Sequence, residues 1–123
     1  MERKRVVITG MGVISCVGLS IQSYWENLIK GQSGIRIISL FDANDLPCQI
    51  AGEAHDFDPL LFMDRKTARR TPRSTQMALA SARQAFEDAQ LASPMTEPER
   101  VGVYFGTAVG GLDNLTSADH IYR

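Results

Sequence analysis

The sequence is poor in the residues from which small proteins build disulfide frameworks, metal sites and nucleophilic centres. It holds two cysteines, Cys16 and Cys48, and two histidines. The cysteines stand far apart, without a CxxC spacing or a nearby pair of histidines, which argues against a disulfide framework or a zinc site. We therefore expect no metal site, and we assign no catalytic residue within the chain.

Excess charge of one sign and long hydrophobic runs are also missing. The chain has 13 basic and 14 acidic residues and a net charge of −1, so nothing in its overall charge attracts nucleic acid or an anionic membrane. The apolar run that follows Met-Glu-Arg-Lys-Arg is too short for a signal peptide or a membrane span. We expect a cytoplasmic protein of one modest domain, with no nucleic-acid partner.

Two continuous apolar runs, residues 5–9 and 101–105, predict strands that are covered on both faces. Helices are expected between them, and strands separated by helices indicate a parallel α/β sheet. Residues 49–53 predict a further short strand. Because two strands alone do not make a stable sheet, the sequence indicates part of a larger layered structure.

Helix start and stop signals frame two helices. Ser20 is a plausible N-cap, apolar residues follow it at the spacing of one helix face, and Gly31 is a stop signal. Thr71 and Pro72 predict the start of a second helix that runs to about residue 91, with Thr71 as its cap. A short helical turn is expected after Asp58. The second helix carries an apolar stripe that we expect to be deeply buried: Ala78, Ala82, Ala85, Phe86 and Ala89.

Two glycine-rich segments invite a phosphate-binding interpretation. Gly10 and Gly12 follow a predicted strand, as in dinucleotide-binding domains, but Ser15 stands where the third glycine is required. Residues 106–111 follow the other predicted strand but lack the lysine and hydroxyl residue of a P-loop. A small nucleotide-binding domain stays open as an alternative, and the other interpretation is that these glycines permit tight turns and close packing.

Histidine and cysteine chemistry is weakly indicated. His55 precedes Asp56 and His120 follows Asp119, and an aspartate can orient an imidazole for acid-base work. Neighbours in sequence usually point apart, so exposed loop polarity is the simpler expectation. No histidine lies near Cys16 in sequence, and a lone cysteine usually packs as a small hydrophobic residue.

A basic cluster is more informative. Lys66, Arg69, Arg70 and Arg73 recur at the spacing of one helix face, although Pro72 is expected to bend or break a helix there. One interpretation is a solvated helix face. The other is a docking surface for an acidic partner or a phosphate group.

Eight sequence blocks stand out by their order and spacing: residues 7–12, 25–28, 31–35, 41–42, 50–53, 57–59, 64–70 and 105–111. Together they resemble the N-terminal part of β-ketoacyl-[acyl-carrier-protein] synthases, most closely the type II synthase of fatty acid synthesis. One departure is Cys16, where relatives usually have proline. The resemblance implies a partial thiolase-like fold with αβαβα layers, in which residues 1–123 are an incomplete N-terminal segment of a homodimeric synthase.

By the same resemblance, the function is that of an acyltransferase that condenses an acyl thioester with malonyl-acyl carrier protein in fatty acid biosynthesis. In relatives the catalytic cysteine and histidines come later in the chain than residue 123, so the isolated chain is expected to be inactive. No cofactor is implied, because phosphopantetheine arrives on the acyl carrier protein. A non-catalytic carrier-binding or partner module of the same fold family is the alternative.

Two sets of site residues follow from the resemblance. Three basic side chains match the surface that docks the carrier protein: Lys66, Arg69 and Arg70. Val109 matches a position that lines the acyl-chain pocket, where side-chain size influences chain-length preference. Tyr104 and Phe105 are expected to pack within their strand. The chain-length preference and the choice between fatty acid and polyketide synthesis stay open.

Overall fold

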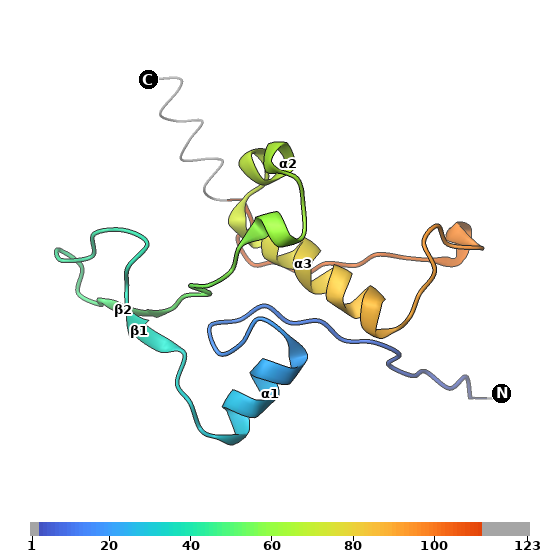
Figure 1. Cartoon of the computed structure of the whole chain (residues 1–123), viewed down its shortest axis with the longest axis horizontal. Helices are drawn as coiled ribbons and strands as arrows, with labels where there is room; N and C mark the ends of the chain where they lie inside the picture. The colour runs from blue at the N-terminus through green and yellow to red at the C-terminus, as the bar shows by residue number, and fades with distance from the viewer. Residues whose placement is uncertain (1–2, 112–123) are drawn as a thin grey trace.

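The computed structural model describes residues 3–111 of the chain, and helices make up most of the regular structure in this range. Figure 1 shows the longest helix, α3, in the middle, with α2 beside its beginning and α1 and the strand pair on the other side of the N-terminal segment. The helices are α1 (Ile21–Ile29), α2 (Arg65–Arg70) and α3 (Arg73–Asp88). Single 3₁₀ turns are η1 (Pro59–Leu61) and η2 (Pro98–Arg100).

The sheet in this range is a pair of short antiparallel strands. β1 (Ile35–Ile37) pairs with β2 (Ile50–Gly52), so that Ile35 lies opposite Gly52. The strand and the helical turn that the sequence predicts around residues 50 and 59 are therefore confirmed. This antiparallel pair is local, because its two strands are neighbours along the chain, and it does not test the predicted parallel sheet.

The predicted strands at residues 5–9 and 101–105 are not formed within residues 3–111. Both segments lack strand hydrogen bonding, and their apolar side chains are exposed instead of covered on both faces. Tyr104 is 96% exposed and Phe105 is also exposed, so the expectation that they pack within a strand is wrong here. The physical reason is that a strand exists only against a hydrogen-bonding neighbour, and the described residues supply none for either segment.

α1 begins and ends where the sequence predicts. The Ser20 hydroxyl accepts a hydrogen bond from the Ser23 amide, and the Ser23 hydroxyl accepts one from the Ser20 amide. The two bonds complete a capping box. Gly31 adopts a left-handed φ of 64°, and the amides of Gly31 and Gln32 donate to carbonyls of the last turn. Glycine adopts this conformation without strain, which is why the helix stops there.

Both ends of α3 differ from the prediction. Thr71 does not cap α3, because its hydroxyl donates to a carbonyl of α2, and Pro72 is the N-cap without a side-chain hydrogen bond. The helix ends at Asp88, because Gln90 takes a left-handed φ of 53° and closes the last turn. No glycine marks this end in the sequence, so the predicted end near residue 91 is slightly late.

The core is small and sits where α3 meets the segment between β2 and α2. Ala54, Phe57 and Ala80 are buried together, and the Phe57 and Phe62 rings stack with centroids 6.0 Å apart. The predicted alanine stripe of α3 is not deeply buried, because its alanines are half-buried, although Ala85 and Ala89 lie against the N-terminal segment. The buried residues of α3 are Gln76 and Ala80, whereas Phe86 is exposed.

The paired glycines near the N-terminus serve close packing. A Cβ atom at Gly10 would lie 2.3 Å from the Ala85 carbonyl oxygen, and one at Gly12 would lie 1.9 Å from the Ser81 carbonyl oxygen. Both glycines thus press the N-terminal segment against the backbone of α3. Because backbone of α3 fills the space beside them, the packing interpretation is confirmed and these glycines leave no room for a dinucleotide.

α2 depends on an aspartate cap. The Asp64 carboxylate accepts the amides of Lys66 and Thr67, and the Thr67 hydroxyl also donates to it. The hydroxyl and amide of Thr67, followed by the amide of Lys66, hold the pKa of Asp64 below its ordinary value of 3.8. The ionised carboxylate therefore fixes the start of this six-residue helix.

Replacing Gly12 with alanine will destabilise the protein, because the new methyl group meets the Ser81 carbonyl oxygen at 1.9 Å and backbone must move. We expect a loss of about 1–3 kcal/mol in the free energy of unfolding, measured by urea titration. Gly106→Ala is the control, because a methyl group added there would have no atom within 4 Å. Equal stability of the two variants would contradict the packing role.

The cap of α2 will fail at low pH. Since the folded-state pKa of Asp64 is lowered, its carboxylate stabilises α2 above the unfolded-state pKa, and this stabilisation is lost as the pH falls through the folded-state value. The amide proton shifts of Lys66 and Thr67, followed by NMR, will change below about pH 4. Asp64→Asn keeps a neutral acceptor and should remove this titration; a titration unchanged in that variant would disprove the assignment.

Candidate functional site

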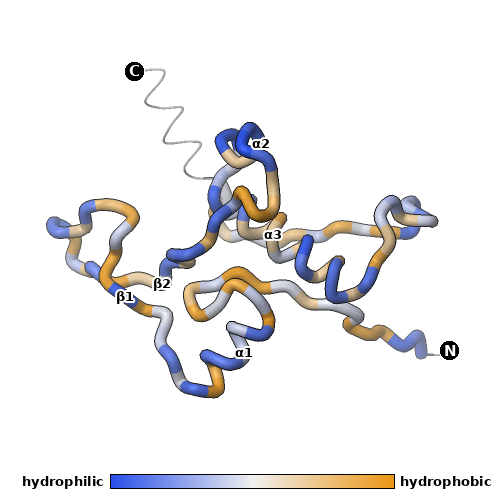
Figure 2. The backbone as a smooth tube through the Cα atoms, in the orientation of Figure 1, coloured by the Kyte–Doolittle hydropathy of each residue, from blue (hydrophilic) through white to orange (hydrophobic). Residues whose placement is uncertain are grey.

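α2 presents a groove whose lining is entirely basic. Four side chains surround a cavity of about 510 Å³: Arg65, Lys66, Arg69 and Arg70. No carboxylate of residues 3–111 forms an ion pair with any of them. Figure 2 shows α2 as a hydrophilic element that stands away from the hydrophobic N-terminal segment. The structure thus brings the three predicted docking residues together and adds Arg65.

Arg73 leaves this basic face. Its guanidinium donates to the Ala54 carbonyl oxygen at 2.7 Å and lies 5.3 Å from the centre of the Phe57 ring. Pro72 separates α2 from α3, so the break expected at this proline is confirmed. Arg73 therefore holds the start of α3 against the core by a hydrogen bond and a cation–π contact.

A second cavity, of about 440 Å³, lies between the first half of α3 and the segment that follows residue 104. Val109 sits in the adjoining bend and is 68% exposed, and it is not among the lining residues. The described residues therefore leave the predicted role of Val109 untested. The cavity is lined by Ser74, Thr75, Ala78, Leu79, Phe105, Gly106, Thr107 and Gly110.

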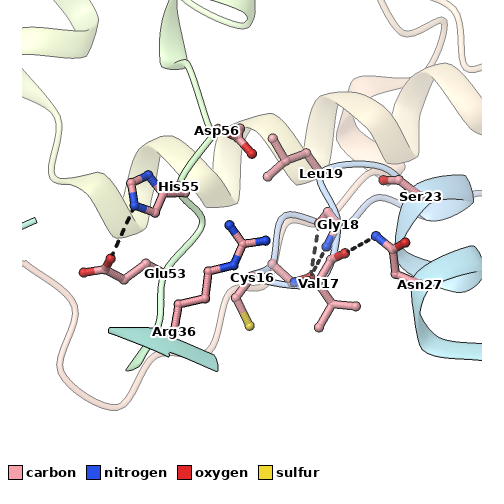
Figure 3. A pocket seen from close by; sticks show the side chains of 11 residues that line it. Cys16, Val17, Gly18, Leu19, Ser23, Asn27, Arg36, Glu53, His55 and Asp56 are labelled. Atoms are coloured by element: carbon pink, nitrogen blue, oxygen red, sulfur yellow. Dashed lines mark hydrogen bonds and ion pairs between the residues drawn. The ribbon is translucent and has the colours of Figure 1, made fainter. Parts of the chain in front are cut away.

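A third cavity, of about 310 Å³, brings Cys16, Arg36 and His55 into one lining. Figure 3 shows the Arg36 side chain rising from β1 between His55 and Cys16, while the Cys16 sulfur points back toward the strand. The sulfur packs beside the backbone of Gly34 and Gly52, where it would meet any added Cβ within 2.9 Å. Cys16 thus fills a crevice over the strand pair, as expected of a small hydrophobic side chain.

The polar cluster at the edge of this cavity superficially resembles a serine-histidine-acid site. His55 Nε2 lies 2.6 Å from Ser39 Oγ, and Ser39 Oγ donates to Glu53 Oε2 at 2.9 Å. The same carboxylate accepts the amides of Ser39 and Leu40. The serine proton is therefore committed to glutamate, so His55 Nε2 must donate to the serine and cannot act as its base.

The carboxylate at the centre of this cluster stays ionised. The Glu53 side chain is only 8% exposed, and this desolvation opposes ionisation, yet hydrogen bonds from Ser39 and Leu40 and the charge of His55 lower its pKa. The cluster joins the end of β2 to the segment after β1. His55 is exposed and lies in a turn, as expected, and its ring also contacts the Ser39 hydroxyl in this cluster.

The remaining candidates add no reactive centre within the described range. Cys48 is exposed, and its thiol donates weakly to the Ile50 carbonyl oxygen. His120 lies outside the described residues. Within residues 3–111 no three metal-binding side chains converge, and no helix is long and apolar enough to cross a membrane.

One buried residue that supports the basic groove was not predicted from the sequence. Gln76 of α3 is 9% exposed, and its amide nitrogen donates to the carbonyl oxygens of Ala68 and Thr71, both at 2.8 Å. These carbonyls belong to the last turn of α2 and to its C-cap. No sequence pattern predicted this role, because the burial of Gln76 and of Ala80, four residues later on the same face of α3, is known only from the structure.

Comparison with known proteins points to one family. The family model for the N-terminal domain of β-ketoacyl synthases matches residues 3–122. A 3-oxoacyl-[acyl-carrier-protein] synthase 2 of Coxiella burnetii is 47% identical over 91% of this chain and 27% of its own length. The enzyme of the same name from Synechocystis is 43% identical over 94% of this chain and 28% of its own. The chain thus spans a little over a quarter of these relatives.

A solved structure resembles the chain as well. The ishigamide ketosynthase/chain length factor aligns with 74% of this chain and 23% of its own chain, with a TM-score of 0.68 and 38% sequence identity. The fold is accordingly a partial, N-terminal portion of a thiolase-like domain. The family-model match, the sequence identities and the structural likeness agree, and the chain belongs to the β-ketoacyl synthase family.

Proposed function

We propose that this chain is the N-terminal part of a 3-oxoacyl-[acyl-carrier-protein] synthase, an acyltransferase of fatty acid biosynthesis. The observation that carries the proposal is the 47% identity with the Coxiella burnetii 3-oxoacyl-[acyl-carrier-protein] synthase 2 over 91% of this chain. The reaction transfers an acyl group from its thioester to the malonyl group on acyl carrier protein. A carbon–carbon bond forms, the carbon–sulfur bond of the acyl thioester breaks and frees its thiol, and carbon dioxide leaves. The acyl groups enter on the phosphopantetheine arm of the carrier, so this chain itself needs no cofactor.

The part played by this chain in the reaction is recognition of the carrier protein. The groove at α2 is lined by four cationic side chains, and none of them pairs with a carboxylate of residues 3–111. It therefore offers a surface for an acidic protein. Lys66, Arg69 and Arg70 are the proposed docking residues, and Arg65 joins them. Exposed charges of this kind steer encounter and lose strength with added salt.

The remaining proposals extend the same assignment. Val109 contributes to the acyl-chain pocket, a role that rests on the resemblance of residues 105–111 to the family. The full protein works in the cytoplasm as a homodimer. Neither a nucleophile nor a base is proposed among the described residues, since the Cys16 sulfur is packed over the strand pair and His55 is engaged by Ser39.

One alternative function is binding of the carrier protein without catalysis. A non-catalytic carrier-binding module would use the same basic groove, which is the observation that favours it. The two functions predict equal binding of acyl carrier protein and differ only in whether the natural protein forms a 3-oxoacyl product.

The natural full-length protein will convert acyl and malonyl carrier proteins into a 3-oxoacyl carrier protein, detected by intact-protein mass spectrometry. The 123-residue chain alone will form none, because the family resemblance puts the catalytic cysteine and histidines later in the chain than residue 123. Product from the short chain would overturn the assignment of catalysis to residues outside it. Absence of product from the full-length protein, with binding retained, would favour the non-catalytic alternative.

Reversing one charge in the groove will weaken binding of the carrier. For Arg69→Glu we expect a Kd about fivefold higher, which corresponds to roughly 1 kcal/mol, and a shallower dependence on salt. Lys30→Glu is the matched control, because Lys30 is an exposed lysine at the end of α1, away from the groove. Isothermal titration with acyl carrier protein measures both, and an equal loss in the two variants would show that only net charge matters.

A further inference from the structure

α2 is too short to hold its own shape. It has six residues, whereas isolated helices need about 12–15 residues to be even marginally stable in water. Its N-terminus is held by Asp64, but a helix of this length also leaves carbonyl groups without partners at its C-terminal end. The geometry of the basic groove therefore depends on whatever satisfies that end.

Gln76 satisfies it. The amide nitrogen of its side chain lies 2.8 Å from the Ala68 carbonyl oxygen and 2.8 Å from the Thr71 carbonyl oxygen. Both partners are acceptors, so only the donor end of the amide can serve them. Because Gln76 is only 9% exposed and belongs to α3, the two bonds tie α2 to the rigid helix of the core.

The neighbouring contacts show that α3 is itself fixed at this point. Arg73, one turn before Gln76, is bonded to the Ala54 carbonyl oxygen and stacked on Phe57. Ala80, one turn after Gln76, is fully buried in the core. Gln76 thus links the last turn of α2, where Arg69 and Arg70 lie, to a part of α3 that is held in the core.

We propose that Gln76 is a positioning residue for carrier recognition: its buried amide fixes the end of α2 and thereby orients the cations of the groove toward an acidic carrier protein. This rests on the proposed function of the groove. Gln76 itself touches no substrate. Without its two bonds, α2 samples other orientations, and the apparent affinity falls with the fraction of molecules that hold the binding geometry.

The test compares Gln76→Met with Gln84→Met in the natural full-length protein. Gln84 is a matched control on the same helix, since its amide also bonds two backbone groups, the Val13 amide and the Leu19 carbonyl oxygen, and both belong to the N-terminal segment. Gln76→Met should raise the Kd for acyl carrier protein about tenfold, a size in keeping with the loss of two hydrogen bonds. Gln84→Met should leave the Kd within about twofold of the parent.

A second readout separates positioning from general damage. In Gln76→Met, hydrogen exchange of the amides at residues 68–70 should accelerate, while turnover of a carrier-free acyl thioester should keep its kcat and KM. The KM for the carrier-borne substrate should rise with kcat unchanged. If Gln76→Met fails to fold, Gln76→Asn, which keeps polarity but is one methylene shorter, is measured in the same way.

Each result decides the proposal. A selective rise in Kd and carrier KM for the Gln76 variants supports it. Unchanged carrier binding in the Gln76 variants, while Arg69→Glu weakens binding, disproves the role of Gln76 and leaves the groove intact. If neither the Gln76 variants nor Arg69→Glu alters binding, the proposed function of the groove fails as well. Equal losses from Gln76→Met and Gln84→Met assign the effect to stability alone and disprove positioning.

Discussion

Polar side chains of α3 supply the hydrogen bonds that the surrounding irregular backbone lacks, and the described structure depends on this one helix. Gln84 holds both ends of a turn in the N-terminal segment, and Asp88 accepts the Met11 amide. Gln76 and Arg73 do the same for α2 and for the segment after β2. Backbone N–H and C=O groups need hydrogen-bond partners when they are removed from water. These side chains supply such partners where hydrogen bonds within a helix or a sheet are missing.

The same helix explains why glycines stand where they do. Side-chain hydrogen bonds of about 3 Å bring the N-terminal backbone close to α3. At that distance no Cβ fits at Gly10 or Gly12, because the carbonyl oxygens of α3 occupy the space. Gly10 and Gly12, which resemble a nucleotide-binding fingerprint in the sequence, are therefore explained by close packing. The basic groove at α2 remains as the candidate binding site.

Local features of the fold could be predicted, and features that depend on distant partners could not. The capping residue Ser20, the stop at Gly31 and the break at Pro72 act within a few residues, so their patterns in the sequence suffice. The end of α3 at Gln90 and the capping of α2 by Gln76 have no short-range signal. The apolar patterns of residues 5–9 and 101–105 predict strands, but a strand needs a neighbour, and the described residues contain none. The basic residues proposed for docking follow from spacing and resemblance in the sequence, whereas the buried amide of Gln76 that bonds the end of α2 could be identified only in the structure.

The central claim is that α2 forms the surface on which acyl carrier protein docks. Hydrogen–deuterium exchange of the natural protein with and without acyl carrier protein tests it most directly, because it reports contact along the whole backbone without altering any residue. The claim predicts new protection concentrated at residues 65–70, reduced by added salt. Protection confined to other segments, with exchange at residues 65–70 unchanged at saturating carrier, would contradict it.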